Sequence, residues 1–245
     1  MACSHCLRGD AERTTMSDKI IQAALDKLGG LCDMVGIGGG EPLLTKRVLR
    51  RFYQQLSWYL NTDYFESLWI VTNGKTLVKE IDNYEYSDAN GPLMDTLLLL
   101  SYQVNVSLAV SIDRFHGPDA NLRRHRIEEY FGWIDDINVS SMGPMGSNSL
   151  IQMGRAYGKE LKVYGGEGNN NMYYVDVFGY VWASCDLSYE FMKANRDTVL
   201  CYGNVLTHTT EDFQQAFVNL EEVIRKTEEG VILVTENGIT NLAVI

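Results

Sequence analysis

Short apolar segments alternate with longer amphipathic segments along most of this 245-residue chain, and this order constrains the fold more than any other feature. The apolar spacing predicts helices at residues 15–30, 45–60, 93–102, 119–135 and 147–157. Between them it predicts strands at residues 33–37, 67–71, 105–112 and 137–141. Strands that alternate with helices build βαβ units, so we expect the α/β class with a parallel sheet or barrel.

The pattern changes after Tyr157. Glycine and asparagine dominate residues 165–171 and predict a loop, and the β-rich stretch 172–184, with a turn at Phe178-Gly179, predicts a hairpin. A last helix is expected at 210–227, followed by a terminal strand or hairpin at 231–238. We therefore divide the chain into a core at 1–165 and a C-terminal part at 166–245, which holds the last barrel strand and a small hairpin-plus-helix extension.

Charge and hydropathy exclude some classes of partner. The net charge of −11 argues against a surface that follows nucleic-acid phosphates. Arginines 123, 124 and 126 flank His125 on a predicted helix, and we interpret them as a solvated face. His208 is also predicted at the surface. No run of about 18 apolar residues predicts a membrane span, so we expect a cytoplasmic protein without a membrane partner.

Two short motifs carry the candidate chemistry. The first is Cys3-Ser4-His5-Cys6, and cysteine thiolates are the usual ligands of iron–sulfur clusters. The second is Gly38-Gly39-Gly40-Glu41-Pro42, which directly follows a predicted strand. Glycines let a backbone approach a ligand closely, and the proline stiffens the exit of the turn. The five cysteines, at 3, 6, 32, 185 and 201, form no regular framework and favour metal or thiol chemistry over disulfides.

Together the two motifs resemble the radical S-adenosylmethionine (SAM) family, in which a C-x-x-x-C-x-x-C loop holds a [4Fe–4S] cluster and a Gly-Gly-Glu-Pro turn binds SAM. The resemblance implies a partial (β/α)6 TIM-like barrel with Cys3 and Cys6 as metal ligands. The first cysteine of the family pattern would lie two residues before Met1. We therefore expect the sequence to begin at an internal methionine of a longer parent, and to lack the first barrel strand.

The same resemblance implies which residues bind SAM. His5 occupies the position before the last cysteine, the glycine-rich turn takes the methionine amino group, and polar residues at the ends of later strands meet the rest of the ligand. The implied SAM-binding residues are His5, Gly38, Gly39, Gly40, Glu41, Pro42, Asn73, Ser111 and Asp113.

The predicted hairpin before Cys185, with Cys201 further on, resembles the auxiliary-cluster extensions of radical SAM enzymes that modify peptides. Those clusters normally need three or four cysteines, and this region offers two. A structural remnant or a packing role for both cysteines is therefore expected. The alternative is a catalytic, substrate-facing thiol at Cys185.

The function implied by the resemblance is reductive cleavage of SAM to a 5′-deoxyadenosyl radical, which then abstracts hydrogen from a substrate. The substrate would be a peptide or a small molecule, and a flavodoxin or ferredoxin would donate the electron. The alternative is a catalytically inactive scaffold or binding module derived from the same fold.

Overall fold

The computed structural model describes residues 14–38, 40–44, 46–60, 66–83, 93–112, 116–142, 163–164, 173–185, 187–226, 232–235 and 238–240. These residues form two compact units. The first unit comes from Gly29–Pro144, and the second from Ala2–Leu28 together with Met145–Ile245. The helix expected at 147–157 lies outside the described residues.

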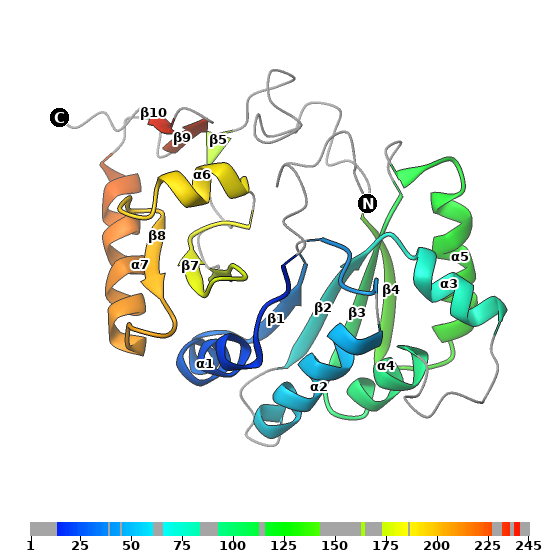
Figure 1. Ribbon diagram of the computed structural model, residues 1–245. Helices are drawn as coiled ribbons and strands as arrows, with labels where there is room; N and C mark the ends of the chain where they lie inside the picture. The colour runs from blue at the N-terminus through cyan, green and yellow to red at the C-terminus, as the bar shows by residue number, and fades with distance from the viewer. Residues whose placement is uncertain are drawn as a thin grey trace. The chain divides into compact units, whose positions relative to one another are not determined.

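A four-stranded parallel sheet forms the centre of the first unit (Figure 1). Its strands are β1 (Met34–Ile37), β2 (Ser67–Thr72), β3 (Asn105–Ser111) and β4 (Ile137–Met142), and they lie side by side in chain order. The predicted α/β class with a parallel sheet is confirmed. In the part of the chain that the structure describes, this sheet is open, with β1 and β4 at its edges, and no closed barrel forms.

Four helices of the first unit pack as one continuous layer. They are α2 (Lys46–Leu60), α3 (Lys75–Asp82), α4 (Leu93–Ser101) and α5 (Ala120–Phe131). Helix α2 contacts α4, α4 contacts α3, and α3 contacts α5, while both α4 and α5 also contact β3. The residues between Asn73 and Asp82 had no predicted element, so α3 is new.

The two faces of the sheet differ in chemistry. Leu68 pairs with Val106 and Ile70 with Leu108 across β2 and β3, and all four side chains are buried. Side chains alternate between the faces of a strand, so these leucine, isoleucine and valine residues share the core face. The intervening residues of β2 and β3 point the other way; they include Trp69, which is half-buried and pairs with Ser107.

The second unit contains two small antiparallel sheets and three helices. One sheet has β6 (Tyr174–Val175), β7 (Tyr180–Trp182) and β8 (Cys201–Asn204), and the other has β5 (Val163–Tyr164), β9 (Ile232–Thr235) and β10 (Gly238–Thr240). The helices are α1 (Asp18–Leu28), α6 (Tyr189–Ala194) and α7 (Thr210–Arg225). The predicted hairpin is present as β6 and β7.

Helix α1 packs with residues that follow it by most of the chain length. The ammonium of Lys27 donates to the carbonyl oxygens of Val205 and His208, both at 2.6 Å, and Thr210 Oγ1 donates to the Lys27 carbonyl at 2.9 Å. The first helix therefore belongs to the second unit, whereas the sequence-based division placed it in the core at 1–165.

Asp176 organises the β6–β7 turn. Its buried carboxylate accepts hydrogen bonds from the backbone N–H of Phe178 at 2.8 Å and of Tyr180 at 3.0 Å, and from Trp182 Nε1 at 3.1 Å. Gly179 completes the turn with a φ of 86°. A buried carboxylate needs such donors, because an unpaired one would lose its hydration without compensation.

None of the described helices is long and apolar enough to cross a bilayer.

Candidate functional site

The candidate site lies at the carboxyl edge of the parallel sheet. Gly38 follows β1, Asn73 follows β2, and Ser111 ends β3. Neighbouring parallel strands end at the same edge of a sheet, where ligand-binding loops of α/β proteins gather. The predicted SAM-binding residues that the structure describes therefore share one edge.

Glu41 joins the loop after β1 to the end of β2. Its Oε1 atom accepts a hydrogen bond from Thr72 Oγ1 at 2.6 Å and one from the Leu43 N–H at 3.1 Å. Its Oε2 atom accepts from the Asn73 N–H at 2.8 Å and from the side-chain amide of Asn73. The two predicted ligand-binding segments are thus in direct contact.

The four donors occupy the hydrogen-bonding positions of the Glu41 carboxylate. A carboxylate offers about four lone-pair positions, and each oxygen of Glu41 already has two partners. The side chain therefore holds the turn in place. A ligand at this edge would meet the main chain of the turn rather than the Glu41 carboxylate.

The main chain beside Glu41 is accessible. Gly38 and Gly40 are exposed, and no atom lies within 4 Å of the place where a Cβ of either residue would be. Pro42, by contrast, is buried. The turn is therefore anchored on its exit side and open at Gly38 and Gly40.

Asn73 and its neighbours form a tight turn at the end of β2. The Lys75 N–H donates to Asn73 Oδ1 at 2.9 Å, and the Gly74 N–H donates to Thr72 Oγ1 at 3.1 Å. Gly74 has a φ of 72°, and a Cβ there would lie 2.9 Å from Ile127 Cδ1. Another residue would be strained at this φ and would have to displace the end of the Ile127 side chain, so glycine is favoured here.

Arg123 of α5 reaches the same turn. Arg123 is 5% exposed, and its guanidinium donates from Nε to the Asn73 carbonyl at 2.9 Å and from Nη2 to the His116 carbonyl at 2.8 Å. Nη1 lies 2.6 Å from Asp119 Oδ2. This bond from Arg123 lowers the pKa of the Asp119 carboxyl below its usual value.

The prediction that Arg123 belongs to a solvated face is wrong. The buried residues of α5 are Ala120, Arg123, Ile127 and Phe131. Arg123 therefore occupies the apolar stripe of the helix, four residues before Ile127. That spacing is visible in the sequence and could have identified Arg123 as a buried charge that needs partners.

Of the remaining predicted SAM-binding and metal-binding residues, the structure describes only Ser111. Ser111 is 7% exposed and pairs with Met142 across β3 and β4. The predicted SAM-binding residues His5, Gly39 and Asp113 and the predicted metal ligands Cys3 and Cys6 lie outside the described residues. Within the described residues, no three His, Cys, Asp or Glu side chains group as metal ligands would.

Cys185 and Cys201 lie in the second unit, near the β7–β8 pair. Cys201 is paired with Trp182, and the Ala183 N–H donates to the Leu200 carbonyl at 2.9 Å, so the chain that leads to Cys185 runs beside β8 at first. Both cysteines are half-buried, and neither forms a disulfide with another described cysteine. Burial raises the pKa of the Cys201 thiol, which lowers its reactivity.

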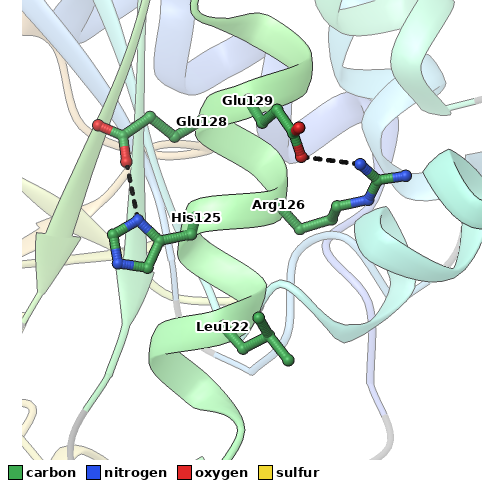
Figure 2. Close-up of a pocket in the computed structure, with 5 residues that line it drawn as sticks. All are labelled: Leu122, His125, Arg126, Glu128 and Glu129. Atoms are coloured by element: carbon green, nitrogen blue, oxygen red, sulfur yellow. Dashed lines mark hydrogen bonds and ion pairs between the residues drawn. The ribbon is translucent and has the colours of Figure 1, made fainter.

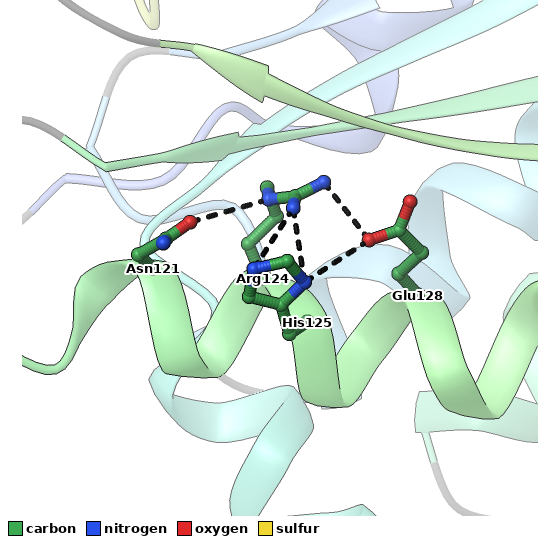
Figure 3. A network of polar contacts seen from close by, with 4 residues as sticks. All are labelled: Asn121, Arg124, His125 and Glu128. Carbon is green, nitrogen blue, oxygen red and sulfur yellow. Dashed lines mark hydrogen bonds and ion pairs between the residues drawn. The ribbon is translucent and has the colours of Figure 1, made fainter.

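A hollow lies on the exposed side of α5 (Figure 2). It is open, has a volume of about 400 Å³ and is lined by Leu122, His125, Arg126, Glu128 and Glu129. Figure 3 shows that Arg124 also pairs with Glu128, at 2.9 Å between Nη1 and Oε2, while the His125 ring lies 3.5 Å from the same oxygen. These are pairs three or four residues apart on one helix, which stabilise a helix slightly. Arg126 is exposed, as predicted, whereas Arg124, which was predicted on the same solvated face, is half-buried.

Comparisons with family models, curated proteins and solved structures find nothing that matches this chain.

Proposed function

We propose that this chain is a radical SAM-type protein and that its first unit binds SAM at the carboxyl edge of the sheet. The observation that carries the proposal is the bonding of Glu41 to Thr72 and Asn73. This contact unites two segments to which the family resemblance assigns SAM binding.

The sheet topology supports the proposal. Four parallel strands in chain order, with their helices in one continuous layer, have the arrangement of a section of a β/α barrel. We interpret the first unit as part of a partial (β/α)6 barrel. In barrels of this type, functional groups lie at the carboxyl ends of the strands, where Gly38, Asn73 and Ser111 are found.

Each residue then has a defined task. The exposed main chain at Gly38 and Gly40 binds the amino-acid end of SAM, because glycines allow close approach to backbone groups. Glu41 and Pro42 hold that turn against β2. Ser111, and Asp113 by resemblance, bind the ribose.

The cysteine motif completes the proposal. Cys3 and Cys6 would hold a [4Fe–4S] cluster, with His5 beside the ligand. The cluster would supply the electron that cleaves SAM to a 5′-deoxyadenosyl radical, which abstracts hydrogen from a peptide or small molecule. A flavodoxin or ferredoxin would be the electron donor.

The second candidate is an inactive scaffold of the same fold. One observation favours it: the Glu41 carboxylate is fully used by Thr72, Asn73 and Leu43, so the turn is held without any ligand. A scaffold would keep these contacts for stability alone.

The test is anaerobic reconstitution of the full chain with iron and sulfide, followed by incubation with SAM and dithionite. The proposal predicts bound iron and formation of 5′-deoxyadenosine, and both should be lost in a variant with Cys3→Ala and Cys6→Ala. A Cys32→Ala variant is the control, because Cys32 lies before β1, at the other end of that strand from Gly38. Tight binding of SAM without 5′-deoxyadenosine would favour the scaffold, and absence of both would contradict the proposal.

A further inference from the structure

Arg123 is a buried cation, and its guanidinium is bonded to main-chain groups of two different segments. Nε and Nη2 donate to two main-chain carbonyls. Nη1 lies close enough to the exposed carboxylate of Asp119 for an ion pair, but without the geometry of a hydrogen bond. Because the side chain is only 5% exposed, the guanidinium offers almost no surface to a ligand. Any effect of Arg123 on binding must therefore act through the groups that it holds.

Those groups belong to the candidate site. Asn73 donates its N–H to Glu41 on one side and accepts from Arg123 at its carbonyl on the other. Its side chain donates to Glu41 and accepts from the Lys75 N–H. Asn73 is thus held between a carboxylate from the β1 loop and a guanidinium from α5.

The bond from Arg123 to the His116 carbonyl connects the same guanidinium to the segment that follows β3. His116 lies on the chain that follows β3, after Ser111. Because one planar guanidinium binds the carbonyls of both Asn73 and His116, it fixes the exit of β2 relative to the segment after β3. A lysine could replace the charge but not this fork of donors in fixed directions.

We propose that Arg123 is a positioning residue for the ligand site, which sets the relative position of the β2 and β3 exits and thereby the affinity for SAM. This inference rests on the proposed function. The inference goes beyond the proposed function because it makes the affinity for SAM depend on a side chain that does not contact the ligand.

The experiment compares SAM affinity in variants of the full chain, measured by anaerobic titration calorimetry. Arg123→Gln and Arg123→Lys each leave a carbonyl unpartnered, so the dissociation constant for SAM should rise roughly tenfold or more. Asp119→Asn keeps both carbonyl bonds and should change the dissociation constant by less than about twofold, because the Asp119 side chain is itself 61% exposed.

A control for stability comes from the same helix. Phe131→Leu removes buried volume at the far end of α5, so it lowers the melting temperature without touching Asn73 or His116. It should bind SAM with wild-type affinity at a temperature where it is folded. Equal loss of affinity in Phe131→Leu and Arg123→Gln would reduce Arg123 to a stability residue and overturn the inference.

The remaining outcomes separate the two proposals. Wild-type SAM affinity in both Arg123 variants overturns the positioning role and leaves the proposed function intact. Absence of SAM binding by the wild-type chain contradicts the proposed function, and the positioning role falls with it.

Discussion

Thr72 Oγ1 donates a hydrogen bond of 2.6 Å to Glu41 Oε1, although 31 positions separate the two residues in the chain. The same hydroxyl accepts from the Gly74 N–H at 3.1 Å, and Thr72 is 3% exposed. A single buried hydroxyl therefore connects the acidic turn after β1 with the tight turn after β2. This connection makes two loops into one rim at the carboxyl edge of the sheet.

Glu41→Gln should destabilise the first unit. The amide replaces one carboxylate oxygen by an NH₂ group, which then faces donors from Thr72 and Leu43 or from Asn73. Loss of bonds to a charged acceptor costs about 1–3 kcal/mol in the free energy of unfolding. Urea denaturation measures the change.

The matched control is Glu66→Gln, an exposed glutamate just before β2. It should change the unfolding free energy by no more than about 0.5 kcal/mol. Equal stability of Glu41→Gln and Glu66→Gln would show that the Glu41 contacts do not hold the rim.

Gly203→Ala should destabilise the second unit. Gly203 has a φ of 123°, and a Cβ there would lie 2.6 Å from His208 Cδ2. His208, which we predicted at the surface, is half-buried, and its Nδ1 accepts from the Asn204 N–H at 3.1 Å. The substitution should cost about 2 kcal/mol or more, from backbone strain and displacement of the ring.

Gly30→Ala is the comparison for that variant. A Cβ at Gly30 meets no atom within 4 Å, and its φ lies outside the left-handed range. Thermal unfolding should show a lower melting temperature for Gly203→Ala alone. Similar melting curves for the two variants would mean that the β8 geometry tolerates a side chain.

Helix α7 should lose stability in acid through its capping box. Thr209 is the N-cap: Asp212 accepts from the Thr209 N–H at 2.8 Å, and Thr209 Oγ1 accepts from the Asp212 N–H at 3.3 Å. The bonds from Thr209 lower the pKa of the Asp212 carboxyl below 3.8. Its contribution is therefore complete above pH 3.8 and disappears as the pH falls through the lower folded-state value.

Comparison of the wild-type chain with Asp212→Asn measures this contribution. The variant should be less stable near neutral pH, and the difference should shrink below pH 3.8. Asp135→Asn, at an exposed loop carboxylate, serves as the reference. A difference that is constant between neutral and acidic pH would contradict the role of the Asp212 charge.

Cys32 and Cys201 should react slowly with iodoacetamide. Burial is the main cause that raises the pKa of both thiols, and Asp33 adds to it at Cys32. At pH 8 the thiolate fraction is then smaller than that of a free cysteine, and thiolate is the nucleophile. Peptide mapping by mass spectrometry should show slower alkylation in the folded chain than in denaturant, and equal rates would contradict this assignment.

Much of the first unit follows from the sequence. Residues 67–71, 105–112 and 137–141 were predicted as strands, and β2, β3 and β4 match them within one residue at each end. Compact apolar runs bounded by turn residues are strong local signals for buried strands. Helix α3 was missed because it has only eight residues and begins after the left-handed Gly74, with no side-chain cap.

Contacts between segments that are distant in the chain could not be predicted from the sequence. Glu41 was expected to face a ligand, and nothing local indicates that Thr72 and Asn73 supply its donors. Lys27 likewise binds carbonyls 178 and 181 positions away, which places α1 in the second unit. Such contacts depend on the tertiary fold, whereas apolar periodicity reports only on the local element.

The most direct test of the account is hydrogen–deuterium exchange of the full chain, prepared anaerobically, with and without saturating SAM. We predict slower exchange at the amides of residues 38–44 and 73–75 when SAM is present. Unchanged exchange in both segments, or protection confined to the second unit, would contradict a SAM site at the carboxyl edge of the sheet.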